Sequence, residues 1–227
     1  MTDLCTNCDA TLKKDDKFCS QCGQNTQSFQ RPFFPFLKNS LHELFDIDGR
    51  LSLTLKTMIS CPGKLSSEFA QGKRAKYTPP LRLYLVISVI FFLLFSTIEG
   101  IANSDKLQSQ TNFDLYPKAM FVLFPFFAFV VSWFYRKSYY LNNLVFSMHI
   151  HSVAYLLLAI VGPLEKIEQS HQLFLILQIP AAIYFIWYFF IAFKTMFQEA
   201  WQLTLLKSAA IYFIYMATLG FVFDQLL

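Results

Sequence analysis

Residues 81–101 read LRLYLVISVIFFLLFSTIEGI, an apolar run that carries charges only at Arg82 and Glu99. An α-helix of about 20 such residues spans the hydrocarbon core of a bilayer. Four further runs of similar character follow at 117–135, 143–162, 171–193 and 207–226. The sequence therefore predicts an all-α integral membrane protein with about five transmembrane helices.

The composition of the whole chain agrees with a membrane location. Of its 227 residues, 55% are hydrophobic, only 15% are charged, and 27 are Phe. Globular domains carry about 25% charged residues, and a soluble chain with this aromatic content would expose large apolar patches and aggregate. The composition excludes a secreted disulfide scaffold, a disordered tail and an ordinary cytosolic enzyme.

Charge divides the chain into a polar head, a basic neck and an apolar body. The net charge is −1 over residues 1–30, +5 over residues 31–82 and zero over residues 83–227. This excess is too small to predict nucleic-acid binding, whereas basic residues beside an apolar span usually meet anionic headgroups. The lipid bilayer is therefore the expected partner, and no nucleic acid is expected. The predicted domains are the head at 1–28, the neck at 29–80 and the transmembrane bundle at 81–227.

The head contains four cysteines in two C-x2-C pairs. They are Cys5 and Cys8, then Cys19 and Cys22. A zinc ion takes four thiolates at tetrahedral corners, and each short loop points two sulfurs to the same side. Gly23 follows the last cysteine, where the second loop needs a positive φ. The head is therefore predicted to be a small zinc ribbon with structural Zn²⁺, because four protein ligands leave no open position. Two disulfides are the alternative, and they would require an oxidising compartment.

The neck predicts short amphipathic helices at the membrane surface. Apolar residues recur at three- and four-residue steps in 33–45, a segment too polar to span a bilayer. This helix is expected either in the headgroup plane or against the transmembrane bundle, and both placements stay open. Further short helices are expected at 51–59 and 64–71, ended by Pro62-Gly63 and by Gly72.

Basic residues beside the spans predict the orientation in the membrane. Eight lie at one set of span ends: Lys73, Arg74, Lys76, Arg82, Arg136, Lys137, Lys194 and Lys207. Three lie at the opposite ends: Lys106, Lys118 and Lys166. Because basic residues favour the cytoplasmic side, we expect a cytoplasmic N-terminus and zinc ribbon, with the C-terminus on the opposite side. No signal peptide is expected before the cysteines, so reduced thiols are expected to hold the metal.

A series of short elements in the neck accompanies the cysteine head. In order, they are Phe45, Asp48-Gly49-Arg50, Thr54, Pro62-Gly63, Gly72-Lys73-Arg74, Tyr77 and Pro80-Leu81. With the run from Cys5 to Gln24, they resemble a bacterial membrane-protein family, domain-of-unknown-function family 3667. The resemblance covers residues 1 to about 90. It implies a zinc ribbon, this neck and several hydrophobic spans in a bacterial cytoplasmic (inner) membrane, and it implies no activity.

His149 and His151 are the candidate functional polar residues inside the spans. At positions i and i+2 they point about 200° apart on a helix, so they cannot bind one metal ion together. They serve either hydrogen bonding between helices or a function such as solute transport. Pro125 and Pro180 lie inside predicted spans, and each frees a backbone carbonyl. Transporters use such breaks in binding sites, but kinks also occur as packing features.

Enzyme interpretations have less support. The motifs G-x-S-x-G and H-E-x-x-H and the P-loop are absent from the sequence. Asp48, Arg50, Lys73 and Arg74 are expected at the membrane surface, where they could act on a lipid headgroup. A turn in which aspartates cap helices and pair with Arg50 is the alternative.

The closed metal site and the missing catalytic motifs favour a non-enzymatic role. In this hypothesis the zinc ribbon and the neck dock or assemble a cytosolic or membrane protein partner. A small-solute or ion transporter that uses His149 and His151 is the first alternative. A lipid-modifying enzyme at the cytoplasmic membrane surface is the second. A homo-oligomer is compatible with the Phe-rich surface.

Overall fold

Helices account for most of the residues that the computed structural model describes, which are 4–13, 16–26, 50–102, 115–167 and 171–226. The helices are α2 (Leu51–Ser60), α3 (Lys64–Ala70), α4 (Pro80–Ala102), α5 (Leu115–Phe134), α6 (Tyr140–Ile167), α7 (His171–Phe197) and α8 (Trp201–Leu226). The described residues contain no strand, only two isolated β-bridges in the cysteine head. The prediction of an all-helical chain is confirmed.

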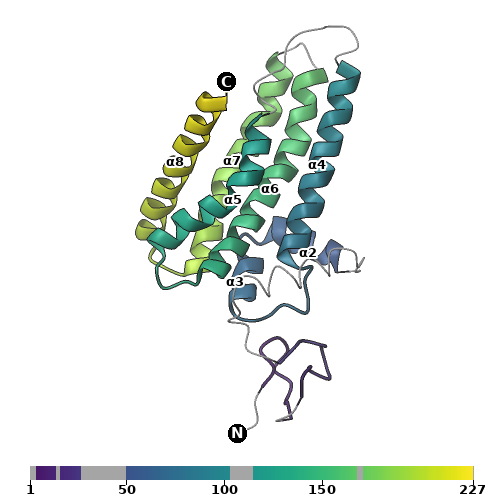
Figure 1. Ribbon diagram of the computed structural model, residues 1–227, viewed down its shortest axis with the longest axis vertical. Coiled ribbons are helices and arrows are strands. Elements are labelled where there is room, and N and C mark those ends of the chain that lie inside the picture. Colours follow the sequence, from purple (N-terminus) through teal and green to yellow (C-terminus); the bar gives the residue numbers. More distant parts are fainter. Residues whose placement is uncertain (1–3, 14–15, 27–49, 103–114, 168–170, 227) are drawn as a thin grey trace.

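Helices α4 to α8 lie side by side and form a bundle (Figure 1). Helix α6 packs against α4, α5 and α7, while α8 packs against α5 and α7. The apolar stretch of α6 is 67% buried, against 22% for those of α7 and α8. Helix α6 is therefore the centre of the bundle. The cysteine head lies at the end of the bundle where α4 and α6 begin, and α8 ends at the opposite end (Figure 1). We call the first of these the ribbon end.

Three of the described helices are long and apolar enough to cross a membrane. These stretches are Tyr140–Gly162, Gln178–Phe197 and Trp201–Val222, and shorter apolar helices occur at Pro80–Phe95 and Lys118–Phe134. A helix thus occupies each of the five expected positions, but five membrane spans remain a prediction. Helix α8 begins at Trp201, ahead of the expected span at 207–226, so Lys207 lies inside the helix.

The outer faces of the bundle are apolar. Ile183 and Ile186 of α7 are 62% and 67% exposed, and Leu206 and Phe213 of α8 are 69% and 70% exposed. In water such contiguous apolar surface would drive aggregation. In a bilayer the same apolar surface would face the hydrocarbon chains of the lipid, which agrees with a membrane protein.

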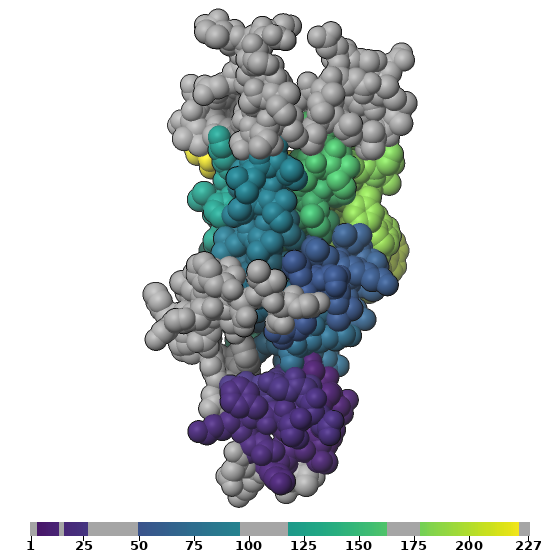
Figure 2. All heavy atoms as spheres, turned by 90° about the vertical axis from the view of Figure 1, so that its right-hand side faces the viewer, coloured from purple at the N-terminus to yellow at the C-terminus, as the bar shows by residue number. Residues whose placement is uncertain are grey.

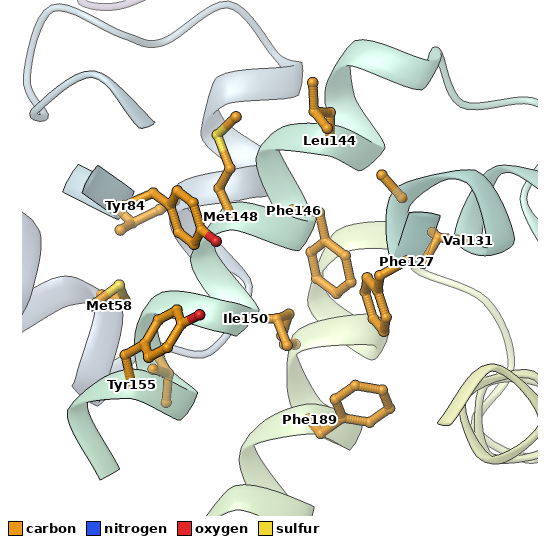
Figure 3. Close-up of a cluster of buried hydrophobic side chains, with 14 of the residues drawn as sticks. Met58, Tyr84, Phe127, Val131, Leu144, Phe146, Met148, Ile150, Tyr155 and Phe189 are labelled. Carbon is orange, nitrogen blue, oxygen red and sulfur yellow. The ribbon is translucent and has the colours of Figure 1, made fainter. Parts of the chain in front are cut away.

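The core between the helices is aromatic and includes a residue of the neck. Tyr84 of α4, Phe127 of α5 and Tyr155 of α6 are buried there together with Met58 of α2 (Figure 3). Pro125 lacks an N–H, so the carbonyl of Phe121 loses its helical partner. The Tyr84 hydroxyl donates a hydrogen bond to that carbonyl over 3.2 Å. The break in α5 therefore serves packing between α4 and α5.

The two neck helices that the structure describes occupy the predicted positions. Helices α2 and α3 correspond to the segments expected at 51–59 and 64–71. The helix expected at 33–45 lies outside the described residues. Helix α3 packs against α6 and α7, and α2 packs against α3 and α6. We call residues 50–79, which contain α2, α3 and the link to α4, the platform.

The turn between α2 and α3 touches the backbone of α7. Gly63 has φ +76°, and a Cβ atom at this position would overlap the carbonyl oxygen of Ala192. Only glycine combines this left-handed conformation with such a close approach. Gly63 therefore allows the platform to seat directly on the bundle.

Replacing Gly63 by alanine is expected to lower the stability of the protein by at least about 2 kcal/mol, because the overlap is with backbone and the φ is unfavourable. The measurement is thermal unfolding of the purified protein in mild detergent. The matched control is Gly220→Ala in α8, where an added Cβ has nothing within 4 Å. Equal melting temperatures for the two variants would contradict the close approach.

Candidate metal centre and its contact with the bundle

The cysteine head consists of two loops with the same backbone pattern. In the first, Cys5 N–H donates to Ala10 O over 2.9 Å and Asp9 N–H donates to Cys5 O over 2.9 Å. In the second, Cys19 N–H donates to Gln24 O over 2.7 Å, and Gly23 N–H donates to Cys19 O over 2.8 Å. Each loop is flanked by an antiparallel bridge, Leu4 with Thr11 and Phe18 with Asn25.

The residue after the second cysteine of each loop has a left-handed backbone. Gly23 has φ +71°, as the sequence predicts, and Asp9 has φ +57° at the equivalent position. Asp is among the few residues that tolerate this region. The two loops are therefore pseudo-equivalent copies of one turn, and they face each other.

The four thiols converge on one point. Their Sγ atoms all lie within 4.8 Å of one another. Cys5 Sγ is 3.7 Å from Cys22 Sγ, and Cys8 Sγ is 3.7 Å from Cys19 Sγ. A zinc–sulfur bond of about 2.3 Å gives a tetrahedron with edges of about 3.8 Å. The four cysteines could therefore hold a metal ion in tetrahedral geometry.

The thiols differ in their ease of ionisation. Backbone N–H groups of Cys22 and Gln21 lower the pKa of Cys19 to about 7. The backbone N–H of Ala10 also lowers the pKa of Cys8, but desolvation and the neighbouring thiols together outweigh it and raise that pKa to about 12. Four thiolates at this spacing repel one another, so full ionisation requires a cation among them.

One side chain joins the cysteine head to the platform. Gln24 Nε2 donates to Gly72 O over 2.5 Å and to Thr6 Oγ1 over 2.8 Å. Gln24 Oε1 accepts from the backbone N–H groups of Arg74 and Ala75 over 3.1 and 3.4 Å. The Gln24 amide thus holds the cysteine head to the platform. The two parts are in contact in Figure 2.

The backbone groups of the platform that bind Gln24 are exposed to it because α3 ends in a Schellman motif. Lys73 N–H donates to Glu68 O over 2.9 Å, and Gly72 N–H donates to Phe69 O over 3.0 Å. Gly72 sits at the left-handed C′ position with φ +90°, which glycine favours. The chain turns out of the helix there and presents the backbone of Gly72, Arg74 and Ala75 to the head.

The basic residues proposed for headgroup chemistry instead bind the backbone. Arg50 Nη1 donates to Ala75 O over 2.7 Å, so Arg50 contacts the residue that directly follows Gly72-Lys73-Arg74. Arg74 Nη2 donates to Phe69 O over 3.2 Å, and its guanidinium lies 4.2 Å from the Phe69 ring centroid. Lys73 lies at the same turn, and Asp48 lies outside the described residues. Arg50 and Arg74 therefore shape the end of the platform.

Buried hydrogen bonds order the platform and hold it to the bundle. Within the platform, Thr54 Oγ1 accepts from Thr78 N–H over 2.9 Å, which joins α2 to the residues just before α4. Ser66 Oγ lies 2.7 Å from His149 Nδ1, which fastens α3 to α6. His149 is thus a contact between the platform and the centre of the bundle.

His151 faces a different neighbour. Its Nδ1 lies 2.8 Å from the carbonyl oxygen of Ser147, which can only accept, so Nδ1 carries the proton. Nε2 is then the acceptor for the Tyr215 hydroxyl of α8, over 2.7 Å. The two histidines therefore contact different helices, as their spacing on α6 implies, and they do not form a common metal site.

Sequence reasoning did not identify Gln24, Ser66 or Tyr215 as site residues. The nearest signal was the position of Gln24 directly after Gly23, where the second metal-binding turn closes. Ser66 and Tyr215 carry no distinctive motif. Their roles follow from partners that are 83 and 64 residues away in the chain.

A family model described as Protein of unknown function (DUF3667) matches residues 48–92. This match confirms the resemblance seen in the sequence over these residues, a shorter range than the residues 1 to about 90 expected. It covers the platform and the first half of α4, the segment that contacts both the cysteine head and the bundle. Comparison with curated proteins and with solved structures gives no match.

Substituting Cys19 by serine is expected to abolish metal binding, because three thiolates no longer complete the tetrahedron. Metal content per chain, measured on the purified protein, should fall from one ion to none. Cys61→Ser is the control, since Cys61 is exposed on the platform and lies outside the cluster. Equal metal content in both variants would mean that the ion is held elsewhere.

Replacing Gln24 by alanine is expected to release the head from the platform at a cost of about 1–3 kcal/mol, since the Arg74 and Ala75 amides lose their acceptor. Hydrogen exchange at residues 72–75 should accelerate while metal content stays unchanged. The control is Gln71→Ala, because the exposed Gln71 amide donates to Ser67 Oγ one turn earlier and, among the described residues, makes no bond to the head. Unchanged hydrogen exchange at residues 72–75 in Gln24→Ala would disprove that the Gln24 amide holds the head to the platform.

Proposed function

We propose that this protein is a non-enzymatic docking or assembly factor of a bacterial cytoplasmic (inner) membrane. Its zinc ribbon, on the cytoplasmic side, recruits or organises a cytosolic or membrane protein partner. The observation that carries the proposal is the set of hydrogen bonds from the Gln24 side chain to the backbone of Gly72, Arg74 and Ala75. A ribbon fixed to the bundle in one orientation presents a defined surface, as a docking site requires.

The metal is proposed to be structural zinc. All four ligands are supplied by Cys5, Cys8, Cys19 and Cys22, and the sulfur spacing fits the tetrahedron that Zn²⁺ prefers. Such a site leaves no position for a substrate or a reactive water. Zinc there supplies folding energy to a head too small for a hydrophobic core. A role in binding rather than in catalysis is consistent with this.

The proposed topology has five spans with the ribbon in the cytoplasm. Arg136 and Lys137 follow α5, and Lys194 lies in the last turn of α7, so these basic residues gather at the ribbon end with the head. Basic residues at helix ends favour the cytoplasmic side. Five passes then leave the end of α8 on the opposite side.

The ribbon carries two exposed apolar side chains at equivalent positions. Leu4 and Phe18, which precede the first cysteine of each loop, are 57% and 60% exposed. A head of this size gains nothing from exposing a large apolar residue in each loop, whereas interfaces are anchored by such residues. We take Leu4 and Phe18 as the centre of the docking surface.

The two alternatives have less support. A transporter that uses the histidines would need them free for a solute, but Ser66 engages His149, and Ser147 and Tyr215 engage His151. An enzyme acting on headgroups would need Arg50 and Arg74, which bind backbone carbonyls of the platform.

Leu4→Ser with Phe18→Ser is expected to reduce partner recovery at least about tenfold, because each anchor contributes on the order of 2 kcal/mol. The measurement is quantitative mass spectrometry of proteins cross-linked to the full-length protein in native membranes. Leu4→Met with Phe18→Tyr, which keeps the surface apolar, should retain the partner.

Metal content of each variant verifies that the ribbon is intact. Capture of the same proteins by all variants would contradict a docking surface at Leu4 and Phe18. Recovery of the protein's own chain alone would contradict recruitment of a different protein.

A further inference from the structure

A large cleft lies between the ribbon and the ribbon end of the bundle. Its volume is about 1540 Å³. Thr6 and Gln24 line it from the ribbon, Gln71 and Arg74 from the end of α3, and residues 133–142 from the turn between α5 and α6. The cleft is larger than the roughly 300–1,000 Å³ of a typical small-ligand site. It therefore has room for a headgroup together with the first part of its acyl chains.

The charged residues among the described residues that line the cleft are mostly basic. The cations are Arg74, Arg136, Lys137 and Lys207, and the one carboxylate among these described residues is Glu199. Glu199 is already ion-paired, since its Oε1 lies 2.7 Å from Lys207 Nζ. Arg136 and Lys137 are both exposed, and among the described lining residues no further carboxylate balances their positive charge. This charge selects an anion.

The neighbours of Arg136 are those of a lipid headgroup region. Trp133 and Tyr139, which flank it in the turn, are 63% and 60% exposed. The Arg136 guanidinium lies 5.9 Å from the Trp133 ring centroid. Exposed Trp and Tyr beside basic residues at the end of apolar helices mark the membrane interface. Phe129 of α5, 54% exposed one turn before Trp133, continues the surface towards the bilayer core, where acyl chains would lie.

One wall of the cleft also carries polar side chains, those of Ser138 and Asn142. Both are partly exposed, so the cleft offers polar contacts to a ligand as well as charge.

We propose that the cleft binds the headgroup of an anionic phospholipid, with its phosphate at Arg136 and Lys137 and its glycerol or hydroxyl groups at the polar lining. The shared chemistry is a phosphate-bearing anion, and the aromatic rim and adjacent apolar face assign its source to the bilayer rather than to solution. This inference does not depend on the docking proposal. The bound lipid would contact bundle and ribbon at once, because Thr6 and Gln24 form one wall.

The test uses Trp133 as a reporter within the cleft. The chain contains three tryptophans, so Trp187→Phe with Trp201→Phe leaves Trp133 as the only one. This protein is placed in phosphatidylcholine nanodiscs that contain either brominated phosphatidylglycerol or brominated phosphatidylcholine at equal mole fraction. Quenching of Trp133 by the phosphatidylglycerol should exceed quenching by the phosphatidylcholine several-fold.

Removing the cations should abolish this preference. Arg136→Gln with Lys137→Gln is expected to bring the ratio of the two quenching efficiencies to about one, since each charge lost weakens binding of an anion about fivefold, or by about 1 kcal/mol. The matched control, Lys56→Gln with Lys64→Gln, removes the same charge from exposed residues of the platform outside the cleft lining and should keep the preference. Metal content and thermal unfolding report whether the double variant folds. If it does not, Lys137→Gln alone should also lower the preference of Trp133 quenching for phosphatidylglycerol.

Glycerol 3-phosphate, added in solution, distinguishes the two sources of the phosphate. A lipid preference that survives this competitor supports the lipid site. Binding of glycerol 3-phosphate, seen as a change in Trp133 emission without lipid enrichment, would overturn the lipid assignment in favour of a soluble ligand. Equal quenching by both lipids with no effect of the competitor, or equal loss in the platform control, would overturn the cleft as an anion site. Enrichment that disappears only when a co-purified acidic protein is removed would replace the lipid with a protein partner.

Discussion

The close approach of the Gly63 backbone to Ala192 in α7 is the contact on which the ribbon end depends. It seats the turn between α2 and α3 directly on the bundle, so that Ser66 reaches His149 and the end of α3 faces away from the helices. The Schellman turn at Gly72 then presents backbone groups to Gln24. A single hydrogen bond between membrane helices contributes on average about 0.6 kcal/mol. The backbone contact of Gly63 with α7, rather than any one polar contact, therefore sets the position of the platform on the bundle.

Polar side chains inside the bundle join neighbouring helices by hydrogen bonds. The Tyr84 hydroxyl satisfies the carbonyl freed by Pro125, and Tyr215 donates to His151. Asn143 donates to Ser132 Oγ across the start of α6 and the end of α5. No water is available at such positions to satisfy an unpaired group, so each must find its partner within the protein. This requirement is sufficient to explain why these residues are polar.

The sequence predicted local features that depend on a few neighbouring residues. The cysteine spacing predicted four thiols that converge and could hold a metal ion, and Gly23 predicted backbone with positive φ, as observed. Pro62-Gly63 and Gly72 predicted where α2 and α3 end. The long-range contacts were not predictable, because the hydrogen bonds of Gln24 and His149 join residues about 50 and 83 positions apart. Neither residue differs in type or local pattern from a polar residue that makes no such contact.

The sequence by itself determined the apolar character of the long helices and the four cysteines that could hold a metal ion. Apolar length and composition favour lipid as the surroundings of the bundle, and two C-x2-C turns place four thiols at the spacing of a tetrahedral site. Only the tertiary structure decided that the ribbon is clasped to the bundle, that the histidines join helices, and that Arg136 and Lys137 meet the ribbon across a cleft. The reason is physical: helix and loop geometry follow from interactions over a few residues, whereas these contacts depend on how whole helices pack. That packing is fixed by backbone approaches such as Gly63 on Ala192, which no local pattern encodes.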